Sequence, residues 1–310
     1  MTFPTRRQFL ASLPAGFLGA FLTPDVSAST SGNLYRGLPW NTVFVGEDKF
    51  QSLCAQAQRG QWAQLPIGQR TSTVGKALLG SSYGNYTLEI HDRIESPSVN
   101  FRNLDCWTFY EISLAFARMI RSHPAPWNGA ELLQLIELER YRGGKCDGSY
   151  LSRMHQLEEV FHDNERRGLG TNITRSLGGV KVQRNVREMQ IAWKQYRYLR
   201  NNPSLLSGIA RVEARVSGLP VSYIPRKQVA GIEHLLRDGD VLAIASYDET
   251  AYTSHVGMAL RKGDTCRFMH ATSSRDKGRC CIVDARISQY LAEKSDHMGL
   301  IVFRPGEATA

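Results

Sequence analysis

The feature that most constrains the fold is a change of pattern near Asp238, where helical periodicity gives way to short apolar runs separated by turns. The predicted strands cover residues 241–245, 254–260, 267–271, 280–283 and 299–303. A helix is expected over 287–294, before the last of them. Consecutive strands joined by short turns pair as antiparallel neighbours. This part of the chain therefore predicts a mostly antiparallel sheet.

The part of the chain before Asp238 is dominated by helical patterns. Helices are expected over residues 47–59, 67–79, 106–120, 130–140, 152–167 and 185–200, and short strands over 212–216 and 221–224. Helices followed by a run of strands is an α+β order. No internal repeat and no clear linker divides residues 29–310, which are expected to form a single domain.

The N-terminal residues predict export. Arg6 and Arg7 precede an apolar run over 9–22 that is too short to anchor a chain stably in a bilayer. Small residues at 26–28 suit a signal peptidase, so cleavage is expected after Ala28. The paired arginines favour the Tat translocase, with an ordinary secretory signal or an uncleaved anchor as alternatives. We therefore expect a periplasmic or secreted mature protein with no stable membrane anchor.

The composition is that of an ordinary globular protein, with 42% hydrophobic and 22% charged residues. The formal net charge is +9, and about +8 once Arg6, Arg7 and Asp25 have been removed with the signal. After export, an anionic wall polymer or a carboxylate-bearing peptide is a better candidate for the partner of this charge than nucleic acid.

A candidate nucleophile lies within NLDCWTFYEISLAFAR, residues 103–118. Asp105 is a good helix N-cap, and aromatic and aliphatic residues then recur at helical spacing from Phe109 to Ile120. Cys106 falls in the first turn, where backbone amides and the helix dipole favour a thiolate. The alternative is a small hydrophobic residue in a core, which is the role of most free cysteines.

Two histidines occupy consecutive strands of the predicted sheet. His255 and His270 are separated by one hairpin, which can bring them together across the ladder. A thiolate nucleophile needs a proton acceptor within hydrogen-bond reach and a third group to orient that acceptor. Cys106 with these two histidines meets that requirement, although either histidine alone could be an ordinary half-buried strand residue.

The order of these motifs resembles the NlpC-type branch of the papain-like cysteine peptidases, which cut peptidoglycan peptides. The matching segments are Leu79-Gly80-Ser81-Ser82-Tyr83, Asp105-Cys106, Gly239-Asp240, His255-Val256-Gly257 and His270-Ala271. Residues 105–111 are similar to the DCxTFxE signature of the N-acetylmuramoyl-L-alanine amidase-like subfamily. Residues 150–155 resemble its YxxRxH segment, and residues 223–225 a further marker.

This resemblance implies a papain-like α+β fold, with N-terminal helices and a nucleophile-bearing helix packed on the sheet. It also implies a large helical insertion at about 121–238, because that stretch exceeds what a minimal NlpC domain needs. Trp107-Thr108 replaces the usual Ser-Gly after the cysteine, and Tyr110 replaces a small aliphatic residue. These departures leave the chemistry unchanged and concern the shape of the substrate.

The resemblance also implies roles for individual residues. Cys106 attacks the amide carbonyl, His255 moves the proton and His270 orients His255. Tyr83 occupies the position of an oxyanion-hole hydroxyl, with a turn aromatic packed on the sheet as the alternative. If Cys106 and His255 form a thiolate–imidazolium pair, iodoacetamide is expected to label the thiol well below pH 8.5.

Two further residues are implied as substrate contacts. Arg153 and His155 are expected to line the cleft, where the guanidinium could pair with a peptide carboxylate, or else to form a solvated helix start. The cysteines at 54, 146, 266, 280 and 281 show no disulfide-framework spacing, although a Cys266–Cys280 pair is conceivable. No metal site and no cofactor are indicated.

The preferred hypothesis is an exported cysteine amidase that cleaves the N-acetylmuramoyl–L-alanine bond of wall material or muropeptides through a thioester. The first alternative is a γ-D-glutamyl–diaminopimelate endopeptidase with the same mechanism. The second, from another class, is a non-catalytic wall-binding protein that uses its positive charge.

Overall fold

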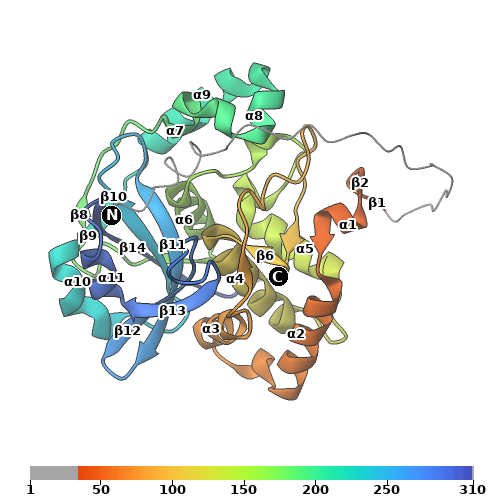
Figure 1. Cartoon of the computed structure of the whole chain (residues 1–310), viewed down its shortest axis with the longest axis horizontal. Helices are drawn as coiled ribbons and strands as arrows, with labels where there is room; N and C mark the ends of the chain where they lie inside the picture. The colour runs from red at the N-terminus through yellow and green to blue at the C-terminus, as the bar shows by residue number, and fades with distance from the viewer. Residues whose placement is uncertain (1–33, 309–310) are drawn as a thin grey trace.

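Helix α4 (Cys106–Ser122) lies at the centre of the computed structural model, which describes residues 34–308. Figure 1 shows the C-terminal strands in blue on one side of this helix and the N-terminal helices on the other. Every residue of α4 from Trp107 to Ile120 is buried. A helix that is buried on all sides requires neighbours all round, and here α3, α5 and strands β11 and β12 supply them. The signal sequence expected over 1–28 lies outside the described residues.

The helices in the first half of the chain agree with the sequence pattern over 47–59, 67–77 and 129–140, whereas residues 40–43 were not expected to be helical and the helix expected over 152–167 begins at Leu157. They are α1 Trp40–Val43, α2 Glu47–Arg59, α3 Ile67–Ala77, α5 Gly129–Arg140 and α6 Leu157–Arg166. Short 3₁₀ turns cover Trp62–Gln64, Arg142–Gly144, Tyr150–Ser152, Trp193–Gln195, Pro203–Leu205 and Glu233–Leu235. Within residues 34–308, none of the helices combines the length and apolarity that a membrane span requires.

The main sheet has eight strands, all paired antiparallel. They are β7 Gly170–Asn172, β8 Val180–Lys181, β9 Ser222–Pro225, β10 Val241–Ser246, β11 Thr253–Lys262, β12 Thr265–Ala271, β13 Cys281–Arg286 and β14 His297–Pro305. Their order is β13-β12-β11-β10-β14-β9-β8, with β7 also paired to β14. The expectation of an α+β protein with a large antiparallel sheet is confirmed.

Strand β10 is buried on both faces of this sheet. Val241, Ala243 and Ala245 belong to the core shared with α4. Leu242 and Ile244 belong to a second core, formed with α10 (Arg226–Ile232) and α11 (Ile287–Ala292) on the opposite face. Burial on both sides explains why this segment is a continuous apolar run instead of an alternating one.

Small two-stranded ladders hold the segment that precedes α4. Strand β4 (Ser82–Tyr83) pairs in parallel with β6 (Asn103–Leu104), and β3 (Phe44–Val45) pairs with β5 (Val99–Asn100). The pair β1 (Leu34–Tyr35) and β2 (Leu38–Pro39) begins the described chain. The β4–β6 ladder places Tyr83 beside Leu104, two residues before Cys106.

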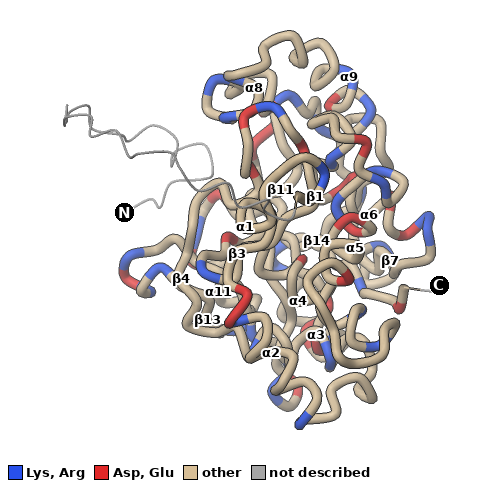
Figure 2. The backbone as a smooth tube through the Cα atoms, turned by 90° about the vertical axis from the view of Figure 1, so that its right-hand side faces the viewer, with Lys and Arg blue, Asp and Glu red and all other residues tan. Residues whose placement is uncertain are grey.

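The segment 121–238, expected to be a helical insertion, contains strands as well as helices, since β7, β8 and β9 join the main sheet. Helices α7 (Glu188–Ile191), α8 (Arg197–Asn201) and α9 (Leu206–Ser217) group together at the top of Figure 1. They share a small core that includes Met189, Leu199 and Ile209. Figure 2 shows basic residues on α8 and α9.

Two local expectations in this segment are wrong. Residues 212–216, expected to be a strand, lie in α9, where Val212 and Val216 are buried four residues apart on one helical face. A short apolar run fits either element, and here helical packing decides. The single helix expected over 185–200 is instead α7, a 3₁₀ turn and α8 in succession.

Candidate active site

The start of α4 is fixed by hydrogen bonds around Asp105. Its Oδ1 accepts from the Thr108 backbone N–H at 2.8 Å, and the Asp105 N–H donates to Thr108 Oγ1 at 3.0 Å, which together form a capping box. Asp105 Oδ2 accepts from Thr87 Oγ1 at 2.9 Å. This carboxylate therefore ends the preceding strand and makes Cys106 the first residue of the helix.

Cys106 is half-buried and lines a cavity of about 210 Å³. His255 lines the same cavity from β11. Other wall residues come from five separate segments of the chain: Tyr83, Trp107, Tyr150, Arg153, His155, Tyr196, Tyr290, Lys294 and His297. The cavity therefore lies where α4, the sheet and the 121–238 segment meet.

The two histidines contact each other across the β11–β12 ladder. His255 Nε2 lies 2.7 Å from His270 Nδ1, and the ring planes are nearly perpendicular. The register pairs Met258 with Met269, so the two histidines are diagonal neighbours. His270 is only 1% exposed, and His255 separates it from the cavity. Cys106 and His255 thus share a cavity, and His270 contacts His255 from behind.

Gly257 allows the close approach of these strands. A Cβ at this position would lie 2.6 Å from the Met269 carbonyl oxygen and 2.7 Å from His270 Cβ. Any other residue would push β11 away from β12 at the point where the imidazoles meet. Close packing of β11 on β12 therefore requires the glycine of the His-Val-Gly motif.

The surroundings of His255 favour its neutral form. Burial is the largest cause and lowers the pKa of His255 well below 6.5, and the charges of His270, Lys294 and His297 lower it further. Asp284 acts in the opposite direction. At neutral pH the resting ring is therefore a proton acceptor, which argues against a standing imidazolium in an ion pair with Cys106.

Behind His270 lies Asp284, which the sequence analysis did not single out. Asp284 Oδ2 is 3.2 Å from His270 Nε2 and 2.5 Å from Lys277 Nζ, and Oδ1 accepts from the Ala285 N–H at 2.7 Å. Hydrogen bonds from His270 and Lys277 hold the pKa of this carboxyl well below its usual range, against the effect of burial. Asp284 lies one residue beyond the strand expected over 280–283, whereas β13 continues to Arg286, so no sequence signal pointed to it.

The sequence model of a known family matches residues 73–300, which contain all of these side chains. The chain belongs to the N-acetylmuramoyl-L-alanine amidase-like family. No curated protein sequence matches it.

Solved structures of other proteins are similar to this family member over most of its length. An N-acetylmuramoyl-L-alanine amidase from Bacteroides uniformis aligns with a TM-score of 0.70 at 25% identity, covering 78% of this chain and 99% of that one. A Bacteroides fragilis protein named as a candidate xylanase aligns at 0.67 and 26% identity, covering 75% and 99%. Protein LPG0564 from Legionella pneumophila, at 16% identity and 0.63, shares the fold over 85% and 97%.

Tyr83 of this amidase-like chain lies in the cavity wall, as the oxyanion assignment requires. Its backbone N–H donates to the Arg279 carbonyl at 2.8 Å, and the N–H of Gly84 donates to Leu104 at 3.2 Å. Backbone pairing on both sides therefore fixes the tyrosine next to the start of α4. Its role at an oxyanion remains a prediction.

Arg153 lines the cavity, and its burial is not that of a solvated helix start, the alternative expected from the sequence. It is 3% exposed, its guanidinium lies 3.6 Å from Glu89 and 3.8 Å from Glu95, and it donates to the Leu88 carbonyl at 2.8 Å. It also lies over the Tyr150 ring. These contacts already balance its charge, and its contribution to substrate binding remains a prediction.

His155 also lies in the wall and has a backbone partner. Its Nε2 lies 2.9 Å from the Tyr150 carbonyl oxygen, which can only accept, so this nitrogen carries a proton. The two rings are 4.4 Å apart between centroids. Contact with a substrate at this position remains a prediction.

Among the remaining histidines, His297 lines the cavity and His91, His123, His162 and His234 do not. The ring of His297 stacks on Tyr290, which in turn lies between it and the His255–His270 pair. Burial and the Lys294 charge lower the pKa of His297 to about 4. The sequence offered no spacing that marked this residue.

All six cysteines of the chain are free thiols, so the conceivable Cys266–Cys280 disulfide is absent. Burial raises the pKa of Cys54 and Cys266 to about 12, and that of Cys281 is raised as well. These buried thiols remain protonated, and Cys106 is the cysteine that lines the cavity. Over residues 34–308, no cluster of three or more His, Cys, Asp or Glu side chains is placed to hold a metal ion.

Proposed function

We propose that this protein is a cysteine-dependent amidase that hydrolyses the bond between N-acetylmuramic acid and L-alanine in peptidoglycan or muropeptides. The family match and the Bacteroides uniformis amidase support the bond, and one observation supports the chemistry. Cys106, at the start of α4, and His255, held by His270, line one cavity. The NlpC-type, papain-like assignment belongs to the same proposal.

In the first half of the reaction, His255 accepts the thiol proton of Cys106, and the sulfur attacks the amide carbonyl. The first-turn amides of α4 and the helix dipole favour negative charge at the sulfur and at the carbonyl oxygen. The Tyr83 hydroxyl is the second donor proposed for that oxygen. Return of the proton from His255 to the leaving L-alanine nitrogen breaks the C–N bond and leaves a thioester on Cys106.

In the second half, His255 takes a proton from water, and the hydroxide attacks the thioester carbonyl. The carboxylic acid of the muramic lactyl group leaves, and the proton returns to the sulfur. The net reaction adds one water to the amide and yields one acid and one amine, so the enzyme returns to its starting state.

The cavity suits amide hydrolysis better than glycoside hydrolysis, the reaction implied by the name of the Bacteroides fragilis structure. Glycosidases use two carboxyl groups, one on each side of the scissile bond. Of the three wall carboxylates, Glu89 lies beside Arg153 and Asp105 caps α4, which leaves Asp296 without a second carboxylate to act with. A cysteine beside a histidine is instead the arrangement of acyl transfer.

The test is digestion of purified muropeptides, followed by mass spectrometry. The parental protein should release an intact stem peptide with a free L-alanine amine and a sugar with a free lactyl carboxylate. Cys106→Ala should lose activity by at least about 1,000-fold. Cys280→Ala, at the other half-buried cysteine, is the matched control and should keep parental activity. Parental rates in Cys106→Ala would refute the proposal.

The same digest separates the two alternatives. Release of a dipeptide would assign the cut to the γ-D-glutamyl–diaminopimelate bond and retain the mechanism. Binding of muropeptides without release of any fragment would identify a wall-binding protein and reject the enzyme.

We further propose that the protein acts in the periplasm or outside the cell, after export by the Tat translocase and cleavage near Ala28. The twin arginines and the apolar run that follows them support this part. Substitution of both arginines by lysine should leave the uncleaved precursor in the cytoplasm, as fractionation and immunoblotting would show. Cleavage of that variant at the parental rate would contradict Tat export.

A further inference from the structure

We propose that Asp284 is a positioning residue that sets the protonated nitrogen of His255 through His270. The proton positions are inferred from the hydrogen-bond geometry alone. Their consequence for catalysis rests on the proposed function. Three side chains on adjacent strands β11, β12 and β13 form the relay: His255, His270 and Asp284.

The Asp284 carboxylate faces three hydrogen-bond donors: the Lys277 ammonium, the Ala285 N–H and His270 Nε2. An ionised carboxylate can only accept hydrogen bonds, and the ammonium at 2.5 Å keeps it ionised. His270 therefore carries its proton on Nε2. Lys277 also lies 3.5 Å from Glu293, which holds it at this place.

The proton position on His270 determines which of the two imidazoles donates the hydrogen bond between them. With the proton on Nε2, a neutral His270 presents a lone pair at Nδ1. This nitrogen lies 2.7 Å from His255 Nε2, which must then be the donor. Burial lowers the pKa of both rings, so each carries a single proton at neutral pH.

The proton on His255 Nε2 determines which nitrogen of this ring can act at the cavity. With its proton on Nε2, His255 presents Nδ1 as the nitrogen able to accept a proton, and His255, unlike His270, lines the cavity with Cys106. When the ring takes the thiol proton it becomes an imidazolium, whose Nε2–H remains bonded to His270. The relay therefore selects the tautomer that can act as a base and stabilises its protonated form.

Asp284→Asn is the critical variant because it keeps the shape of the side chain and adds a donor. The new NH₂ group must replace an oxygen that now accepts from Lys277, His270 or Ala285. Where it faces His270, it reverses the donor and the acceptor in both rings and leaves the proton of His255 on Nδ1. We expect kcat to fall roughly 100-fold or more with KM nearly unchanged.

The control is Asp240→Asn, at a buried aspartate that is also held by a cation but does not line the cavity. Asp240 is 1% exposed and is bonded to Arg304 at 2.7 Å. It should lose stability comparably and retain kcat per folded molecule. Equal losses of kcat in the two variants would show that Asp284 is merely structural.

A direct readout is the ¹⁵N NMR spectrum of histidine-labelled Cys106→Ala protein, because this variant folds around the same relay without turnover. The expected result is Nε2–H at both His255 and His270, changing to Nδ1–H at His255 when Asp284→Asn is added. A proton on His255 Nδ1 before the substitution would overturn the proposal, as would unchanged tautomers after it if Asp284→Asn on the parental background has lost kcat. Absence of muropeptide cleavage by the parental protein would refute the proposed function and leave this test of the tautomers valid.

Discussion

The cavity lined by Cys106 has two walls, which differ in the ionisable side chains that they carry. The sheet wall, from β11, α11 and β14, holds His255 and His297, whose pKa values burial lowers. The other wall holds the Arg153 guanidinium beside the carboxylates of Glu89 and Glu95. The first wall presents imidazoles that are neutral at neutral pH, whereas the second pairs a buried cation with carboxylates. Under the proposed mechanism, the sheet supplies the proton transfers and the segment opposite shapes the site.

The largest effect is expected on the sheet wall. His255→Gln removes the proton acceptor and should lower kcat/KM by about 100- to 10,000-fold, with little change in the free energy of unfolding. His162→Gln, on α6 and outside this cavity, is the matched variant and should change neither quantity. A loss of similar size in His162→Gln would mean that the assay reports folding instead of proton transfer.

The next effect is expected on the opposite wall, in stability. Arg153→Met leaves Glu89 and Glu95 buried without their cation and should lower the free energy of unfolding by about 3–5 kcal/mol, measured by urea denaturation. Residual kcat per folded molecule should remain within a few-fold of the parent. A large fall in kcat at unchanged stability would instead place the guanidinium on the substrate.

A third effect follows from the titration of the sheet wall. His297 has a folded pKa of about 4, and about 6.5 when unfolded, so below pH 6.5 the unfolded chain binds more protons and stability falls. Glu139 and Glu158, with pKa values raised to about 7, act in the opposite direction. The comparison with His297→Gln isolates the histidine, and the parent should lose about 1–2 kcal/mol more than the variant between pH 6.5 and pH 5. If the parent and His297→Gln show the same pH dependence of the free energy of unfolding, His297 does not contribute to the loss of stability.

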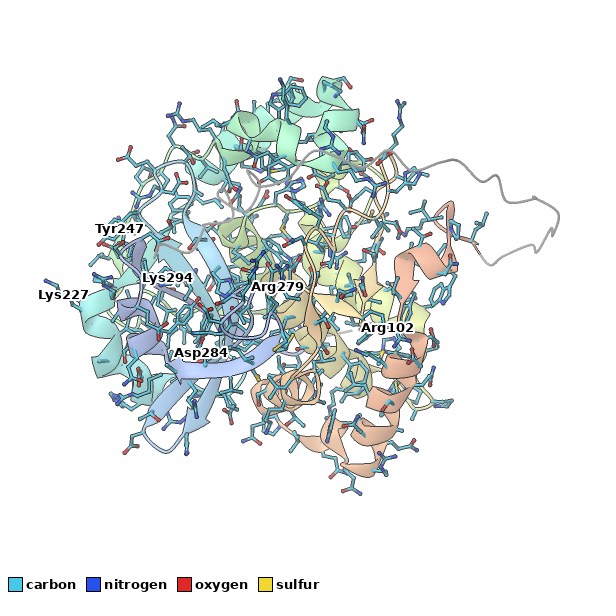
Figure 3. All side chains as sticks on the ribbon, viewed as in Figure 1. Arg102, Lys227, Tyr247, Arg279, Asp284 and Lys294 are labelled. Atoms are coloured by element: carbon cyan, nitrogen blue, oxygen red, sulfur yellow. The ribbon has the colours of Figure 1, made fainter. Side chains whose placement is uncertain are left out.

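The smallest effect is a shift in the pH dependence of the reaction. The groups around His255 are His270, Asp284, Tyr290, Lys294, His297 and Cys106. Lys294→Gln removes one positive charge and should raise the pKa of His255, which moves the acid limb of kcat/KM to higher pH. Figure 3 labels Lys294 and also the exposed Lys227 on α10, whose Gln variant is the control. If the acid limb does not move, His255 is not the base whose protonation that limb reports.

The two walls also differ in how far the sequence predicts them. The strands that carry His255 and His270 follow from apolar runs and turns, because adjacent hairpin strands must pair. Asp284 could not be found this way, since its contact with His270 depends on the irregular register between β12 and β13. Arg153 lies near Glu89 and Glu95 only because a loop more than fifty residues earlier folds against it. The same limit applies to Val212 and Val216, where the pattern fits both a strand and a helix.

The place of β14 between β10 and β9 has a consequence for synthesis of the chain. β14 is an interior strand of the sheet and the last of the described strands to be made, so its neighbours β10 and β9 keep open edges until residues 297–305 have emerged from the ribosome. Open strand edges are templates for aggregation, and a chain interrupted before residue 297 would leave them uncovered permanently.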